Sequence, residues 1–265
     1  MKLKALFRII WWAVLSILLT SFLFFGLSGE LENLKRSVGL SDYDDTGYLV
    51  YDDPTYWTDA GTENSKDNYA ALPAEQIRSL QVEWIKGSVT IQNNERSDRE
   101  VRIWETSGSK LEKADHLRYR IKDGVLSIKF AAPRSSALTA HQLASKQLRI
   151  ELPSSLRLSM QTVEIDCVSS SVKVLGVQAD EMQIQSVSGK VTLSNSIGQK
   201  TEVQTTSGTV LLNYSQFFDF RLRYDTTLGE LTTKLELKQR DGWQYYKDGT
   251  RSVEIVTMGG NLEIT

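Results

Sequence analysis

A short phrase recurs seven times in the chain. A small residue, usually glycine, is followed at its second and fourth positions by β-branched or aliphatic residues, as in GKVTL and GTVLL. A unit of about twenty residues with two short strands cannot bury its apolar face alone, but stacked units bury a continuous column. The repeat therefore predicts a stack of similar units. The copies begin at Gly87, Gly124, Ser170, Gly189, Gly208, Gly229 and Gly260.

We call the first residue of each copy its origin. Apolar residues stand at constant sequence distances from each origin, with polar residues between them, which is the period of two of half-buried strands. This alternation predicts two strands per unit, one on each side of a glycine corner, with one face inward. Residues 76–265 are thus expected to form a single all-β domain, a β-solenoid. Five positions before the origins stand Val82, Tyr119, Ile165, Ile184, Val203, Tyr224 and Ile255; two after them stand Val89, Leu126, Val172, Val191, Val210, Leu231 and Leu262; the polar face carries Glu164, Gln183, Glu202, Arg223 and Glu254.

Glycine suits a tight corner because it adopts positive φ without a steric penalty. A β-sandwich built from hairpins is the main alternative, and it predicts Asn-Gly or Asp-Gly turns between strands. Only Asp123-Gly124, Asp241-Gly242 and Asp248-Gly249 have that form, so the solenoid is favoured.

The early and late units depart from the pattern. Long gaps after Gly87 and Gly124 hold the strand-like runs REVRIWE and KQLRIELP, which indicate a wider, sheet-like start. Residues 234–255 interrupt the last two copies and are typical of a hairpin. Such a hairpin would close the open end of the stack, because unpaired strand edges aggregate.

The N-terminal segment, residues 1–29, is expected to be a membrane anchor. Residues 9–27 contain no charged residue, and as a helix they would span about 28 Å, close to the thickness of a bilayer core. Lys2, Lys4 and Arg8 precede this run, so the positive-inside rule predicts a cytoplasmic N-terminus and an exported repeat domain. A cleaved signal peptide is the alternative, since Gly26 and Ser28 are small enough for a cleavage site.

Residues 30–75 are expected to form an acidic juxtamembrane linker, with eleven acidic and three basic side chains. A calcium-binding loop is the competing interpretation of part of it. Its last ligand would be aspartate in place of glutamate, and Pro54 would block the exiting helix, so a solvated spacer is favoured. The loop positions are Asp42, Asp44, Thr46, Gly47 and Asp53.

The residues that could carry chemistry point to structural roles. Cys167, the only cysteine, lies three positions before an origin, where other copies have serine or threonine, so it is expected to be a small inward residue. His116 and His141 are the only histidines, and neither has another histidine or a cysteine at metal-ligand spacing. We therefore predict no catalytic, cofactor-binding or metal-binding residues and no cofactor.

Two further groups of residues are candidate sites. Paired carboxylates would permit glycoside cleavage, but the outward acids alternate with glutamine and arginine, as solvated faces do. Trp243, Tyr245 and Tyr246 are expected either to pack as a terminal cap or to form a contact surface for a sugar or protein. Nucleic-acid binding is excluded by location and by the modest charge. The outward acids are Glu164, Asp166, Glu202, Asp225 and Glu254.

The run LRIELP, followed by alternating strands and S-G-x-V-x-L phrases behind one N-terminal span, resembles the bacterial putative-adhesin family of β-strand-repeat cell-envelope proteins. The resemblance covers residues 80–265 and implies a β-solenoid outside the membrane, without catalytic residues. It leads us to expect a non-enzymatic, membrane-anchored binding module whose partner is an envelope protein or surface polymer. The alternatives are an envelope-stress regulator acting through its single span and a polysaccharide-active enzyme.

Overall fold

The computed structural model describes residues 58–59, 69–94, 99–132, 143–156, 160–214 and 218–265. Within these ranges no helix is long and apolar enough to cross a membrane. The expected span, residues 9–27, and the calcium-loop alternative, residues 42–53, lie outside them, as does His141. The described part is all-β, with the short 3-10 helices η3 (Ala74–Gln76) and η4 (Lys113–Asp115).

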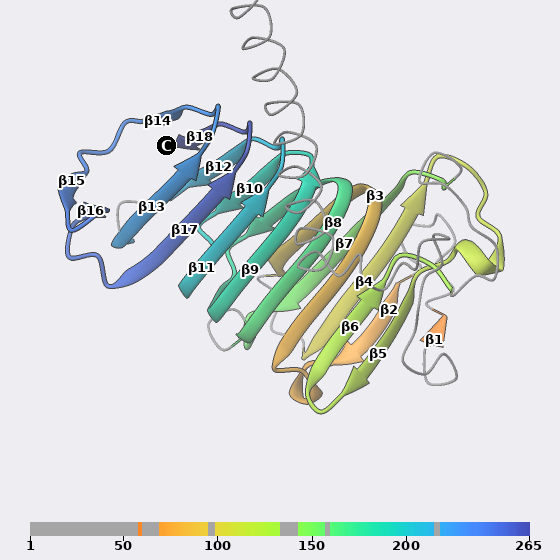
Figure 1. Cartoon of the computed structure of the whole chain (residues 1–265). Coiled ribbons are helices and arrows are strands. Elements are labelled where there is room, and N and C mark those ends of the chain that lie inside the picture. Colours follow the sequence, from red (N-terminus) through yellow and green to blue (C-terminus); the bar gives the residue numbers. More distant parts are fainter. Residues whose placement is uncertain (1–57, 60–68, 95–98, 133–142, 157–159, 215–217) are drawn as a thin grey trace, which may run out of the picture. The chain divides into compact units, whose positions relative to one another are not determined.

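The strands form two layers (Figure 1). Neighbours in the first layer are parallel and follow one another in this order: β6 (Val125–Lys129), the first half of β3 (Ser79–Asn94), the first half of β8 (Met160–Leu175), β9 (Gln178–Ser188), β11 (Ile197–Thr205), β17 (Arg251–Thr257) and β13 (Phe220–Thr226).

The second layer is also parallel. Its order is β7 (Lys146–Pro153), the second half of β3, the second half of β8, β10 (Val191–Ser194), β12 (Val210–Asn213), β18 (Leu262–Ile264) and β14 (Leu231–Thr233). The two longest strands, β3 and β8, therefore belong to both layers.

Antiparallel strands widen the N-terminal end of the stack. In the first layer β5 (Arg118–Lys122) pairs with β6, and β1 (Thr58–Asp59) pairs with β5. In the second layer β4 (Glu100–Ser107) pairs with β7, and β2 (Ala70–Pro73) pairs with β4. The runs REVRIWE and KQLRIELP supply β4 and β7, which confirms the predicted sheet-like start.

The register confirms the predicted columns for six of the seven copies. In each layer the aligned residues are direct neighbours on adjacent strands, and most of them are completely buried. Since these side chains point between the layers, they form the core of the stack. The first-layer column is Val82, Ile165, Ile184, Val203, Ile255 and Tyr224; the second-layer column is Val89, Val172, Val191, Val210, Leu262 and Leu231.

The copy at Gly124 was wrongly assigned to the repeat. Asp123 and Gly124 both have positive φ, 53° and 83°, and they connect β5 and β6 as an antiparallel hairpin. Leu126 consequently pairs with Leu80 in the first layer and does not join the predicted column of Val89 in the second layer. An Asp-Gly pair suits the hairpin because both central residues of such a turn need positive φ.

The units do not stack in sequence order, contrary to the simple stack predicted above. The last copy, β17 and β18, lies between the copy of β11–β12 and the copy of β13–β14. The physical reason is the hairpin of β15 (Lys238–Arg240) and β16 (Trp243–Tyr246). β16 pairs antiparallel with one edge of β13, and the chain then returns along the opposite edge as β17. The hairpin covers the end of the first layer, as expected.

The corner glycines are required for two different reasons. Gly87 and Gly189 have φ of 118° and 121°, which confirms the predicted positive φ there. Gly208 and Gly260 have no positive φ. A Cβ atom on Gly208 would, however, lie 2.0 Å from the carbonyl oxygen of Gly189, and one on Gly260 would lie 1.9 Å from the carbonyl oxygen of Gly208. Neighbouring corners thus approach too closely for any side chain.

Ser170 occupies the corner position where the glycine pattern fails. β8 runs through this position without interruption from Met160 to Leu175, and Ser170 is directly opposite Gly87 in β3. Ser170 itself has no positive φ, so serine is accommodated there. Gly87, at the same place in the equally continuous β3, has a φ of 118° and needs glycine.

Candidate functional site

The small inward residues predicted around Cys167 form a column across the first layer. Three threonine hydroxyls in it accept hydrogen bonds from the backbone N–H of the corner glycine three residues later, at distances of 2.8 to 2.9 Å. This confirms the predicted stack of hydroxyls bonded to local backbone. The column consists of Cys167, Ser186, Thr205, Thr257 and Thr226.

Cys167 is unsuited to nucleophilic chemistry. Its side chain is completely buried, and this burial, with a smaller effect of the neighbouring Asp166 carboxylate, raises the pKa of its thiol well above the usual range. The reactive form of cysteine is the thiolate. The structural role predicted for Cys167 is therefore the one that its position permits.

The predicted outward acids lie on the outer face of the first layer, where Asp166 is buried, contrary to the expected solvated face. None of them lines the groove described below. Glu202 forms an ion pair with Lys200, with 3.5 Å between Oε2 and Nζ, and Glu254 forms one with Arg223, with 3.9 Å between Oε2 and Nη1. Burial, together with the nearby Glu181 carboxylate, raises the pKa of Glu164. The arrangement is an alternation of charges along neighbouring strands, as the sequence indicated.

A buried ionic cluster at the wide end of the stack was missed by the sequence reasoning. Lys146 and Glu105 are 0% and 1% exposed, and the Nζ of Lys146 lies 2.5 Å from Oε1 of Glu105. Glu105 also accepts the backbone N–H of Leu117 at 3.0 Å and lies 3.2 Å from Nδ1 of His116. His116, considered above as a metal ligand, is thus held by this carboxylate.

The remaining protons of the Lys146 ammonium group are also satisfied. It donates to the backbone carbonyls of Asp115, at 2.6 Å, and Phe130. The rings of Phe130 and Trp84 lie over it, with centroids 3.9 and 5.0 Å from Nζ. A buried ion pair needs such a complete set of partners to offset desolvation. The cluster joins β4, β7 and the segment before β5, so its role is to fix the wide end of the stack.

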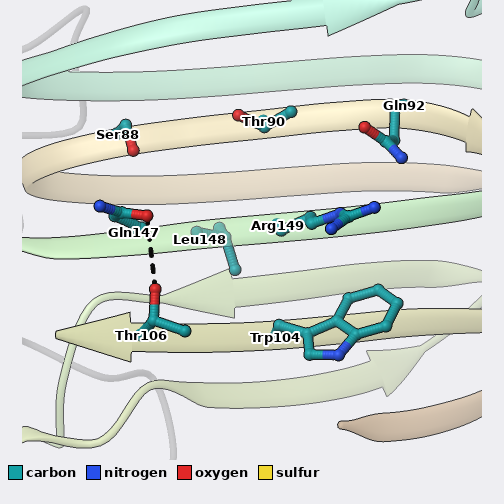
Figure 2. A pocket seen from close by; sticks show the side chains of 8 residues that line it. All are labelled: Ser88, Thr90, Gln92, Trp104, Thr106, Gln147, Leu148 and Arg149. Atoms are coloured by element: carbon teal, nitrogen blue, oxygen red, sulfur yellow. Dashed lines mark hydrogen bonds between the residues drawn. The ribbon is translucent and has the colours of Figure 1, made fainter. Parts of the chain in front are cut away.

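An open groove of about 660 Å³ lies on the outer face of the second layer, across β3, β7 and β4. Figure 2 shows its side chains projecting from these three strands. Leu148 is buried beneath it. The lining consists of Ser88, Thr90, Gln92, Trp104, Thr106, Gln147, Leu148 and Arg149.

The polar groups of the groove are held in place by one another. Thr106 donates a hydrogen bond of 3.5 Å to Gln147, and the amide of Gln92 donates to Glu151 at 3.0 Å. Glu151 also pairs with Arg149, so the single positive charge of the lining is balanced. The groove therefore presents hydroxyl and amide groups with no net charge.

Among the described residues, Trp104 is the only aromatic one that lines the groove. It is half-buried, and its ring centroid lies 5.3 Å from the Arg149 guanidinium and 5.1 Å from the centroid of Tyr69. This packing fixes the ring at the side of the groove (Figure 2). Sequence reasoning missed Trp104, because the alternation in REVRIWE shows that it points outward but not which strands lie beside it.

The three aromatic residues of the late hairpin separate into two groups. Tyr246 packs against Phe220, with ring centroids 5.6 Å apart, and so belongs to the terminal cap. Trp243 and Tyr245 instead contact arginine side chains of β13 and β15. The predicted packing of a terminal cap is confirmed for Tyr246, and a contact surface on Trp243 and Tyr245 stays a prediction.

Comparisons with known proteins bear on the fold and the family. Two solved structures are similar: a putative cell adhesion protein from Clostridium sporogenes and a putative adhesin from Bacteroides fragilis. The first is 13% identical, with coverage of 74% of this chain and 96% of its own and a TM-score of 0.47. The second is 8% identical, with coverage of 77% and 100% and a TM-score of 0.31. No curated protein matches the chain.

The family model of the Toastrack DUF4097 domain matches residues 70–265. This match begins at β2 and includes every strand of the stack from there to β18. It therefore contains both the repeated corners and the antiparallel strands of the wide end. The resemblance inferred from the repeated phrase is confirmed, and the chain belongs to the Toastrack DUF4097 family.

Proposed function

We propose that the chain is a non-enzymatic binding module that takes a neutral glycan of the cell envelope in the groove on β3, β7 and β4. The observation that carries this proposal is the Trp104 ring, fixed beside rows of hydroxyl and amide side chains on rigid strands. A sugar offers apolar C–H faces to an aromatic ring and hydroxyl groups to amides and hydroxyls. The balanced charge of the groove suits an uncharged ligand.

The lining also favours binding over catalysis. The lining residues that the structure describes include no carboxylate, histidine or cysteine, whereas glycoside cleavage needs two carboxyl groups on either side of the bond that breaks. Glu151, the acid next to the groove, is engaged by Gln92 and Arg149. A ligand in the groove would meet hydrogen-bonding groups and one ring, but no acid–base pair.

The replacement Trp104→Ala is expected to weaken glycan binding about 30-fold, the equivalent of about 2 kcal/mol for a central aromatic contact. The full chain, purified in a nonionic detergent, would be titrated with neutral oligosaccharides released from the envelope. Trp243→Ala, at the other end of the stack, is the matched control and should bind like the parent.

Equal affinities of the parent and the Trp104→Ala chain would contradict the assignment of the groove, provided that both chains melt at the same temperature. Release of new reducing ends from the oligosaccharides during the titration would instead identify an enzyme. Failure of the parent to bind any neutral oligosaccharide would remove the proposed ligand class.

The proposal also includes an anchored, extracytoplasmic location. It is supported by the uncharged run of residues 9–27, with basic residues before it and an acidic segment after it. Protease added to intact cells, after any outer layer is made permeable, is expected to digest the repeat domain and leave Lys2 and Lys4 protected. A soluble form beginning near Gly29 would show that the N-terminal segment is a cleaved signal peptide.

A further inference from the structure

A second surface lies at the opposite end of the stack from the groove, on the outer side of β13, β16 and β15. Arg221 and Arg223 flank Leu222, which is completely buried, so the alternation of the strand turns both arginines outward. The register aligns Arg221 with Tyr245 and Tyr245 with Lys238, and it aligns Arg240 with Trp243. We call this set the arginine–aromatic face: Arg221, Arg223, Lys238, Arg240, Trp243 and Tyr245.

The aromatic rings of this face support the guanidinium groups. The Cζ atoms of Arg221 and Arg223 lie 4.7 and 5.2 Å from the centroid of Trp243. That of Arg240 lies 4.5 Å from the centroid of Tyr245. A cation held over a ring is attracted by the electrons of the ring and loses part of its conformational freedom. The arginines are therefore positioned before any ligand binds.

Positive charge predominates on the face. Among the described residues, Arg221 and Lys238 have no carboxylate within 4 Å, while Arg223 and Arg240 have one each, at 3.9 Å. Hydrogen bonding from Arg240, and to a smaller extent from Arg221, lowers the pKa of the Tyr245 phenol. An open pocket of about 460 Å³ is lined by Lys238, Arg240 and Tyr245 of the face, together with Gln239, Lys247 and Asp248, so three cations and one carboxylate meet there. The face is thus suited to an oxyanion.

We propose that the arginine–aromatic face binds a linear envelope polymer whose backbone carries phosphodiester groups. Guanidinium groups match phosphate oxygens with two parallel hydrogen bonds. The cations stand on β13 and β15, two strand spacings or about 10 Å apart, and such an array suits an anion with repeated charges. It differs in charge from the groove, so it is a separate site for a different ligand.

Two other polyanions fit the face less well. Single-stranded nucleic acid needs several ring faces on which successive bases stack, but both rings of this face already hold guanidinium groups, two on Trp243 and one on Tyr245. An anionic membrane would require apolar side chains that project into the lipid boundary, and Trp243 and Tyr245 are only partly exposed. A polymer of polyol phosphates needs neither feature.

The test is a titration of the full chain, in a nonionic detergent, with poly(glycerol phosphate). The double variant Arg221→Gln/Arg223→Gln is expected to bind about tenfold or more weakly than the parent, and the parent should lose affinity as salt is added. The control variant Lys173→Gln/Lys190→Gln removes the same number of positive charges from β8 and from the turn between β9 and β10, and it should bind like the parent. Lys238→Gln/Arg240→Gln provides a second, independent pair on the face.

The proposal is overturned if the parent does not bind poly(glycerol phosphate) at low ionic strength. It is also overturned if the face variants and the charge-matched control bind equally well. Tighter binding of polyglutamate, of oligothymidylate or of phosphatidylglycerol vesicles would replace the polymer by an acidic protein, a nucleic acid or a lipid surface. Melting curves of all variants separate loss of binding from loss of folding.

Discussion

Replacement of Gly260 by alanine is expected to lower the free energy of unfolding by about 2–4 kcal/mol. The new Cβ atom would lie 1.9 Å from the Gly208 carbonyl oxygen and 2.8 Å from the Thr257 hydroxyl oxygen. Neither neighbour moves easily, because one is the backbone of the adjacent unit and the other accepts the Gly260 N–H at 2.8 Å. The alanine side chain therefore forces two neighbouring units apart or breaks the hydrogen bond between Gly260 and Thr257.

Gly259→Ala is the matched control, since a Cβ atom at Gly259 meets nothing within 4 Å. Urea unfolding of the full chain in detergent, followed by tryptophan fluorescence, measures both variants. We expect Gly259→Ala to unfold close to the parent and Gly260→Ala at a clearly lower urea concentration. Coincident curves for the two variants would refute the close approach of neighbouring corners.

The second large effect is expected at the buried ion pair. Lys146→Met should cost about 3–5 kcal/mol, because it leaves the Glu105 carboxylate buried without a counter-charge. Methionine has a similar length, so the loss of packing is small by comparison. The same urea unfolding experiment measures the change.

A second substitution separates charge from packing in this cluster. Glu105→Gln removes the charge and keeps an oxygen that accepts the Leu117 N–H. In the Lys146→Met background it is therefore expected to restore part of the lost stability. A double variant that is less stable than Lys146→Met alone would show that the Glu105 charge is not the source of the cost.

The periodic part of the fold could be predicted from the sequence, because each column depends on local alternation. Val82 and Val89 lie five residues before and two residues after their corner, and the same spacing aligns six units in space. The wrong assignment of Gly124 has a local cause as well. Its leucine and isoleucine match the phrase, but Asp123 creates a hairpin, and turn chemistry takes precedence over apolar spacing.

The parts that could not be predicted depend on contacts between distant segments. Glu105 and Lys146 are 41 residues apart in the chain, and in the sequence each is a charged residue in an alternating strand. Trp104 belongs to the groove only because β4 pairs with β7 in a particular register. Nothing local to either strand specifies that pairing. The position of β17 depends likewise on where the hairpin returns the chain.

The internal position of the last unit has a consequence for how the protein is made. β17 and β18 follow β13 and β14 in the chain and are made after them, yet they lie between β11–β12 and β13–β14. Until they arrive, the first layer has no strand to join β11 to β13. The growing chain can therefore add repeat units one by one only as far as β12. Closure of the stack then waits for β17 and β18, whose loss would leave a gap in the middle and not a shorter stack.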